Sequence, residues 1–220
     1  MKKLLKLLPM FLLVGMLATS CSSDDDDNGG IGAGTLKIGN QSQSLISGSL
    51  VCEDTLTINN ATVYKFELGL VSAGAKWSET SKEFIPDGTP TEAAEVSFSL
   101  YSSSNDGLVD GAYSCADYKS ENYCAAKTYS SSDASIYTNL SDYENDEDGD
   151  LSPTKGDDAF TTNELGLTGE LTVTKAGEAY TFAYSGKATV KYREVASDSV
   201  KSKVVENVTI SYTGLLNVVK

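Results

Sequence analysis

Large apolar side chains recur at every second position through the C-terminal third of this chain, and this period limits what the chain can fold into. Tyr180, Phe182 and Tyr184 fall on one face of an extended segment. Because successive side chains of a β-strand point to opposite faces, the pattern indicates half-buried antiparallel strands. The same alternation includes Leu171, Val173, Ala188, Val190, Tyr192, Val208, Ile210, Tyr212, Leu216 and Val218 here, and Leu36, Ile38, Tyr64, Phe66, Leu68, Leu70, Val96, Phe98 and Leu100 earlier.

The alternation predicts an all-β fold of antiparallel strands. No stretch of ten or more residues after residue 20 shows an apolar stripe at helical spacing. An antiparallel β-sandwich and a closed, lipocalin-like β-barrel both need this inward and outward alternation. The long break from Tyr101 to Asn163 suits a crossover connection, so we predict the sandwich, with the barrel as the alternative.

The first 20 residues have the layout of a secretory signal peptide. Lys2, Lys3 and Lys6 precede an apolar run from Leu7 to Ala18, and small residues follow. The run is too short for a transmembrane helix. The signal predicts export from the cytoplasm.

Leu17-Ala18-Thr19-Ser20-Cys21 resembles a bacterial lipobox, in which the cysteine is acylated and becomes the mature N-terminus. Ser22, Ser23, Asp24, Asp25, Asp26 and Asp27 follow, and this run resembles the acidic export signal of Bacteroidota surface lipoproteins. The resemblance implies a lipid anchor at Cys21 in the outer membrane and a body that faces the cell exterior. The alternative role of the aspartates is a solvated spacer.

We divide the chain into a signal peptide at 1–20, an acidic, glycine-rich tether at 21–34 and one β domain at 35–220. The tether has too few apolar side chains to offset the entropy of ordering it. A polar and acidic insertion is expected near 101–163. The strand layout of residues 34–220 also resembles that of small all-β surface lipoproteins of Bacteroidota, a likeness that supplies no catalytic residue.

Charge and composition exclude several functions. The formal net charge is −14, and removal of the three lysines before Cys21 leaves 14 basic residues against 31 acidic ones, or about −17. Such a surface repels nucleic acid, so we predict no nucleic-acid partner and membrane contact only through the lipid. The chain has no histidine, which removes the commonest general base and the commonest zinc ligand. We therefore predict no enzyme activity, although a pair of carboxylates remains an alternative.

The segment between Tyr101 and Tyr143 is rich in tyrosine, serine and aspartate. Tyrosines on polar loops supply contact area at low entropy cost, so they are candidates for ligand binding. An equally simple interpretation is that they cap the core with the hydroxyl toward solvent. The candidate binding residues are Tyr113, Tyr118, Tyr123, Tyr129 and Tyr137.

An acidic run is the one candidate for a metal site. Glu144, Asp146, Asp148 and Asp150 fall at alternate positions, with Gly149 as in a calcium-binding loop. Lys155 stands where such a loop has its bidentate glutamate, so the sequence predicts a weak calcium site or only a solvated loop. We expect no other cofactor.

Three cysteines remain after Cys21. Cys115 and Cys124 are close enough in sequence for a short disulfide-closed loop, and this pairing is predicted. The alternative is that both thiols, and Cys52, stay reduced.

Taken together, these features predict a lipid-anchored binding module at the cell surface that recognises a glycan or a protein without catalysis. One alternative is a structural or accessory subunit of an outer-membrane complex or a fimbria. The second is a carboxylate-based hydrolase.

Overall fold

The computed structural model describes residues 31–88, 90–116, 119, 122–137, 143–145, 151–153, 160–162, 167–194 and 199–220. Every regular element within these ranges is a β-strand, so the predicted all-β class is confirmed. Within the same ranges, no helix is long and apolar enough to cross a membrane.

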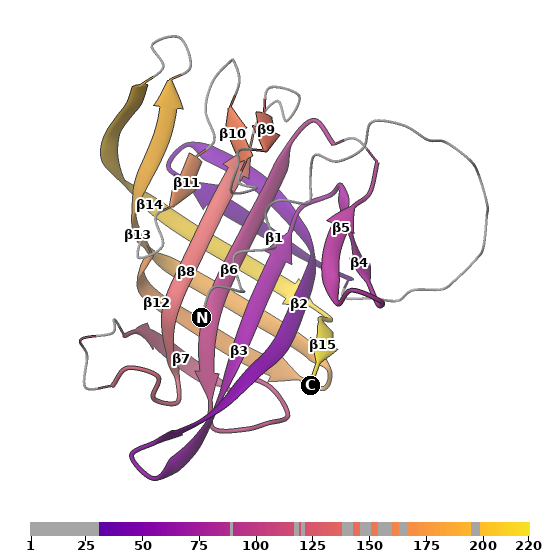
Figure 1. Cartoon of the computed structure of the whole chain (residues 1–220), viewed down its shortest axis with the longest axis vertical. Coiled ribbons are helices and arrows are strands. Elements are labelled where there is room, and N and C mark those ends of the chain that lie inside the picture. Colours follow the sequence, from indigo (N-terminus) through magenta and orange to yellow (C-terminus); the bar gives the residue numbers. More distant parts are fainter. Residues whose placement is uncertain are drawn as a thin grey trace, which may run out of the picture.

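Nine strands form a closed wall (Figure 1). Around the wall they follow the order β1 (Ile31–Ile38), β14 (Ser199–Gly214), β13 (Ala179–Glu194), β12 (Thr168–Ala176), β7 (Gly111–Cys115), β8 (Thr128–Tyr137), β6 (Ala93–Ser102), β3 (Ala61–Val71) and β2 (Gln41–Ile58). β1 closes the ring because it pairs antiparallel with β14 on one edge and with β2 on the other.

The predicted sandwich is therefore wrong, and the barrel alternative is confirmed. The prediction of a sandwich rests on a crossover connection within the segment 101–163. Instead, β7 and β8 from that segment are part of the wall, where they pair in parallel with each other. β7 also pairs with β12, and β8 pairs with β6, both antiparallel. The chain thus departs from a simple up-and-down order without leaving the barrel.

Six shorter strands are described besides these nine. Four of them form two hairpins, β4 (Ala75–Ser78) with β5 (Glu83–Pro86) and β9 (Tyr143–Asn145) with β10 (Leu151–Pro153). β11 (Phe160–Thr162) pairs with β13 and β8. β15 (Asn217–Val219) pairs with β2.

Local sequence explains the tight turn between β2 and β3. Asn59 and Asn60 connect the strands, and both have positive φ angles, 50° and 64°. Two central residues with positive φ are the signature of a type I′ turn, whose twist matches that of the flanking strands, and asparagine tolerates this conformation well.

The start of β1 corrects the predicted boundary of the tether. The sequence places residues 31–34 in the tether, but in the structure they lie in β1, beside β14. Gly34 fits there because a Cβ atom at this position would collide with the carbonyl oxygen of Ser211. A glycine-rich segment can therefore serve as a barrel strand where the neighbouring backbone comes very close. Cys21 and the acidic run after it lie outside the described residues.

The predicted inward faces meet inside the barrel. Tyr180, Phe182 and Tyr184 are buried there. The same core includes Phe66, Leu68, Leu70, Val96, Phe98, Leu100, Leu171, Val173, Val208, Ile210 and Tyr212. Aromatic rings touch within it, with 5.3 Å between the ring centres of Phe98 and Tyr129 on neighbouring strands and 5.8 Å between those of Phe98 and Tyr184 on strands that do not pair. The described interior is thus a packed core.

Candidate functional site

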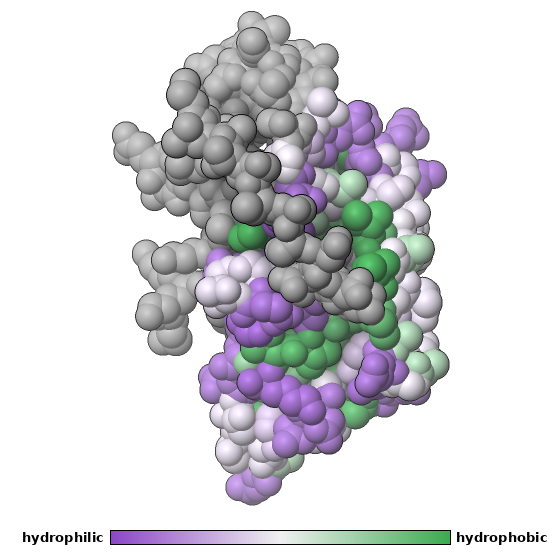
Figure 2. Space-filling view, turned by 90° about the vertical axis from the view of Figure 1, so that its right-hand side faces the viewer, coloured by the Kyte–Doolittle hydropathy of each residue, from purple (hydrophilic) through white to green (hydrophobic). Residues whose placement is uncertain are grey.

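An open groove of about 1040 Å³ lies at one end of the barrel, beside the start of β1 and beside β15. Four of the large apolar side chains along it are strongly exposed: Ile31 at 63%, Val218 at 44%, Ile46 at 41% and Leu215 at 40%. Figure 2 shows apolar residues gathered among polar ones on the face that carries the β4–β5 hairpin and β15. Exposed apolar residues that gather in one place mark an interaction site.

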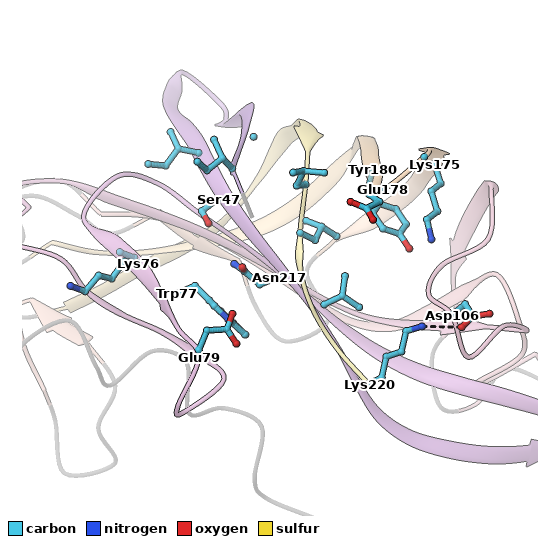
Figure 3. Close-up of a pocket in the computed structure, with 18 residues that line it drawn as sticks. Ser47, Lys76, Trp77, Glu79, Asp106, Lys175, Glu178, Tyr180, Asn217 and Lys220 are labelled. Carbon is cyan, nitrogen blue, oxygen red and sulfur yellow. Dashed lines mark hydrogen bonds and ion pairs between the residues drawn. The ribbon is translucent and has the colours of Figure 1, made fainter. Parts of the chain in front are cut away.

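Several elements that are distant in sequence form the walls. Trp77 and Glu79 come from β4 and the turn after it, whereas Glu178 and Tyr180 come from the turn between β12 and β13 and the start of β13. In Figure 3 these two groups lie on opposite sides of Asn217, which belongs to β15. The groove is therefore a product of the tertiary fold and does not follow any one segment.

Hydrogen bonds and packing fix the floor of the groove. The buried side chain of Asn217 donates from Nδ2 to the carbonyl oxygen of Gly48, at 3.2 Å. Leu216 packs against the main core. Leu215 and Val218, on either side of these two anchored residues, are exposed. The exposed apolar surface is thus attached to a well-anchored strand.

The charged groups along the groove balance one another. The lining has three lysines and three carboxylates, so its side chains are neutral overall in a protein of net charge −14; they are Lys76, Lys175, Lys220, Glu79, Asp106 and Glu178. Lys220 Nζ lies 2.9 Å from Asp106 Oδ1, and its hydrogen bond lowers the pKa of Asp106. Lys175 Nζ lies 5.0 Å from the ring centre of Tyr180, a cation–π contact. Since these lysines already have partners, the groove does not offer a free cationic cluster for an anionic ligand.

Trp77 forms part of one wall, and its half-buried ring is held by neighbours within the hairpin. Its ring packs edge-on against Phe84, with 5.4 Å between ring centres, in a small cluster that includes Val71 and Ala75. Its Nε1 donates to Glu79 Oε1 at 3.0 Å. This agrees with a mainly structural role for the indole, which positions the hairpin beside the groove.

The tyrosines proposed for ligand binding do not form a surface. Tyr113, Tyr129 and Tyr137 are buried, because they belong to barrel strands and not to loops. Their hydroxyls have internal partners: Tyr113 bonds to the backbone of Val109, Tyr129 to Gly169 and Tyr137 to Glu95. Tyr123 is 39% exposed, and Tyr118 lies outside the described residues. The structure thus assigns three of the five candidates to packing.

The calcium prediction falls largely outside the described part of the chain. Asp146, Asp148 and Asp150 are outside it, and Glu144 lies in β9, which pairs with β10. Among the described residues, no group of three or more acidic or cysteine side chains is placed to hold a metal ion. A calcium titration of the mature chain, followed by its melting temperature, remains the test of this prediction.

The predicted disulfide between Cys115 and Cys124 is not present in the structure. Cys115 lies at the exposed end of β7. Cys124 is buried against Val63 and Tyr101, in a small apolar cluster outside the main core. Cys124 therefore packs as an apolar side chain, which its spacing from Cys115 did not indicate.

A pair of close carboxylates does exist, but it is arranged as an ion-pair network. Lys65 Nζ lies 2.8 Å from Glu53 Oε2 and 3.1 Å from Glu67 Oε1, and Ser99 also donates to Glu67. Burial raises the pKa of Glu67, and the hydrogen bond from Ser99 and the charge of Lys65 oppose that rise. Both carboxylates share one cation, and neither lines the groove. They join β2, β3 and β6 on the outside of the barrel.

Glu95 is the most perturbed carboxyl group of the described residues. It lies on β6 opposite Ser135 of β8, and the hydroxyl of Tyr137 donates to its Oε1 at 2.9 Å. Burial raises the pKa of Glu95 to about 8, and the nearby Asp133 carboxylate adds to the rise. Glu95 is therefore protonated in the folded protein at neutral pH but ionised in the unfolded chain.

This difference makes stability depend on pH. Between the pKa values that Glu95 has in the unfolded and the folded chain, the folded state holds a proton that the unfolded state has lost. The contribution of Glu95 to the free energy of unfolding is therefore fully present below pH 4.5 and is lost as the pH rises toward 8. We expect Glu95→Gln to raise the free energy of unfolding at pH 8.5 by roughly 4 kcal/mol and to change little at pH 4. Urea unfolding at both pH values measures this. Glu170→Gln, at an exposed position on β12, is the matched control, and an equal gain in both variants would contradict the assignment.

A sequence signal for the groove did exist. Leu45-Ile46 and Leu215-Leu216 are pairs of adjacent large apolar residues. Side chains alternate along extended chain, so only one member of each pair can point into the core. The structure buries Leu45 and Leu216 and exposes their neighbours. The pairs thus indicate an outer apolar surface, although not that the two sites meet.

Similarity to known proteins does not indicate a function for this groove. Comparison of the chain with protein-family models, curated proteins and solved structures finds no match.

Proposed function

We propose that this protein is a lipid-anchored binding module at the outer-membrane surface, and that it acts through the groove beside β15. One observation carries the proposal. Ile31, Ile46, Leu215 and Val218 come from three separate segments, and all four expose apolar side chains along one groove. An exposed apolar surface of this kind costs solubility unless a partner covers it.

The chemistry of the lining favours a protein ligand over a glycan. Sugar sites need open aromatic faces and free polar groups, whereas the exposed side chains here are aliphatic. The tryptophan of the groove packs on Phe84 and bonds to Glu79. Aliphatic side chains of a protein segment would complement this surface by excluding water, at about 25 cal/mol per Å² buried. Binding without catalysis also agrees with a chain that has no histidine.

A role as an accessory subunit of an outer-membrane complex uses the same surface. In that case the groove would hold a permanent neighbour instead of a transient ligand. The carboxylate-based hydrolase has less support, because the close pair Glu53 and Glu67 shares one lysine away from the groove.

Photo-crosslinking on intact cells tests the proposal. A photoreactive phenylalanine analogue at position 46 is expected to give a discrete protein adduct, and the same analogue at the exposed position 57, outside the groove, is not. Adding Leu215→Glu should reduce the adduct at position 46 by roughly tenfold, because it places a charge in the apolar lining. Equal yields at positions 46 and 57, or an adduct insensitive to Leu215→Glu, would contradict a binding role for the groove.

A further inference from the structure

The most distinctive part of the groove is the backbone of β15. β2 uses one edge for β3, from Ser47 to Ile58, and its other edge for β1 and then β15. β15 thus continues the wall beyond the start of β1, held by three parallel partners in β2. No described strand pairs with the opposite edge of β15. An edge of this kind presents backbone donors and acceptors to any extended chain.

We propose that the ligand of this groove is an extended segment of another protein, which adds to the free edge of β15 as a further β-strand. This inference rests on the proposed function and specifies the partner. β-strand addition combines main-chain hydrogen bonds along an edge with pockets for alternate side chains. Here β15 supplies the edge, and Ile31, Ile46 and Leu215 supply apolar contacts beside it.

The segment that leads into the barrel does not have the composition to fill the groove. The nine residues before Ile31 that follow Cys21 are two serines, four aspartates, one asparagine and two glycines. None has an apolar side chain, and the four aspartates would be placed on an aliphatic surface at a high desolvation cost. Residues 22–30 therefore do not supply apolar side chains that could cover the groove.

The charges of the groove lining favour an uncharged peptide over anionic lipid as the ligand. Contact with anionic lipid depends on unpaired lysines and arginines. In this groove Lys76 lies 3.6 Å from Asp87, and Lys220 lies 2.9 Å from Asp106. The lining is neutral overall, in a chain that is otherwise acidic. It is thus a surface that an uncharged strand with alternating apolar residues can approach without electrostatic penalty.

The C-terminus allows a direct test, because Lys220 directly follows β15 and lines the groove. The mature chain would be extended after Lys220 by Asn-Gly and then Thr-Val-Thr-Val-Thr. Asn-Gly favours a two-residue hairpin turn, which would return the added strand antiparallel along the free edge. The control has proline in place of both valines, since proline has no backbone donor and is excluded from a paired strand.

The extension is expected to slow amide exchange at Asn217–Val219 by at least roughly tenfold relative to the proline control. On cells, the extended protein should lose the adduct from position 46, whereas the proline control should keep it. Equal exchange rates in the two chains would overturn the proposal, because β15 would then not accept a strand. Slowed exchange with an unchanged adduct would also overturn it, because the ligand would then bind elsewhere in the groove.

Other outcomes separate this inference from the function on which it rests. An adduct with lipid, with a glycan or with a second copy of this chain would overturn the proposed partner and leave the groove as a contact surface. The absence of any adduct at position 46 in the unextended chain would instead contradict the proposed function itself.

Discussion

Tyr129→Ala is expected to lower the free energy of unfolding by about 3 to 5 kcal/mol, the range for a large buried aromatic residue. Tyr129 is fully buried and packs edge-on against Phe98. Its hydroxyl donates to the carbonyl oxygen of Gly169 at 2.9 Å and accepts from the amide of Gly169 at 3.2 Å. Alanine removes both the ring contacts and this link between β8 and β12. Urea unfolding of the mature chain measures the loss.

Two further variants separate packing from hydrogen bonding. Tyr129→Phe keeps the ring and removes the hydroxyl, so we expect a smaller loss of about 1 to 2 kcal/mol. Tyr123→Ala, at an exposed tyrosine from the same predicted binding set, should change stability by less than about 0.5 kcal/mol. Equal stability of Tyr129→Ala and the unchanged protein would contradict a packed barrel interior and would restore Tyr129 as a candidate for ligand binding.

Cys21→Ala is expected to abolish fatty-acid labelling of the protein and release it from the membrane. A thiol at the mature N-terminus is the acylation site in the lipobox that the sequence resembles, and a serine or alanine there cannot form the thioether. Metabolic labelling with a radioactive fatty acid measures this effect. Cys52→Ala is the control, and it should retain full labelling because Cys52 lies within β2 of the barrel.

Access of external protease to the barrel tests surface display separately from lipidation. External protease on intact cells is expected to digest the barrel of the unchanged protein. Changing Asp24, Asp25, Asp26 and Asp27 to alanine should protect it, if the acidic run directs export to the outer face. Protection of the unchanged protein would contradict surface display but not lipidation. Digestion of both would leave the aspartates as a spacer.

The strands could be predicted because the alternation of apolar side chains that indicates them lies within short segments of the sequence. Alternation along Tyr180, Phe182 and Tyr184 places three rings on one face, and the structure buries all three. The closure of the barrel has no such local cause. It depends on the pairing of β1 with β14, for example Leu36 with Ile210, and the same alternating faces would also serve a sandwich.

The residues of the candidate site are harder to predict from the sequence than the strands are. The tyrosines between 101 and 143 suggested a polar loop surface, but two strands of the wall run through that segment and turn Tyr113 and Tyr129 inward. The groove joins residues that are more than 180 positions apart, such as Ile31 and Val218. Adjacent apolar pairs can indicate that an outer apolar surface exists. Only the tertiary fold brings these surfaces together.

The most direct measurement of the central claim is to identify, by mass spectrometry, what attaches to photoreactive residues at positions 46 and 215 on intact cells. Both positions lie in the groove but on different segments of the chain. The proposed function predicts that both positions attach to the same other protein. The strand-addition proposal predicts further that both adducts fall within one short stretch of that protein, as expected for an extended chain that advances about 3.3 Å per residue. Adducts at these positions no more abundant than at position 57, or attached to different molecules, would contradict a ligand-binding groove at this end of the barrel.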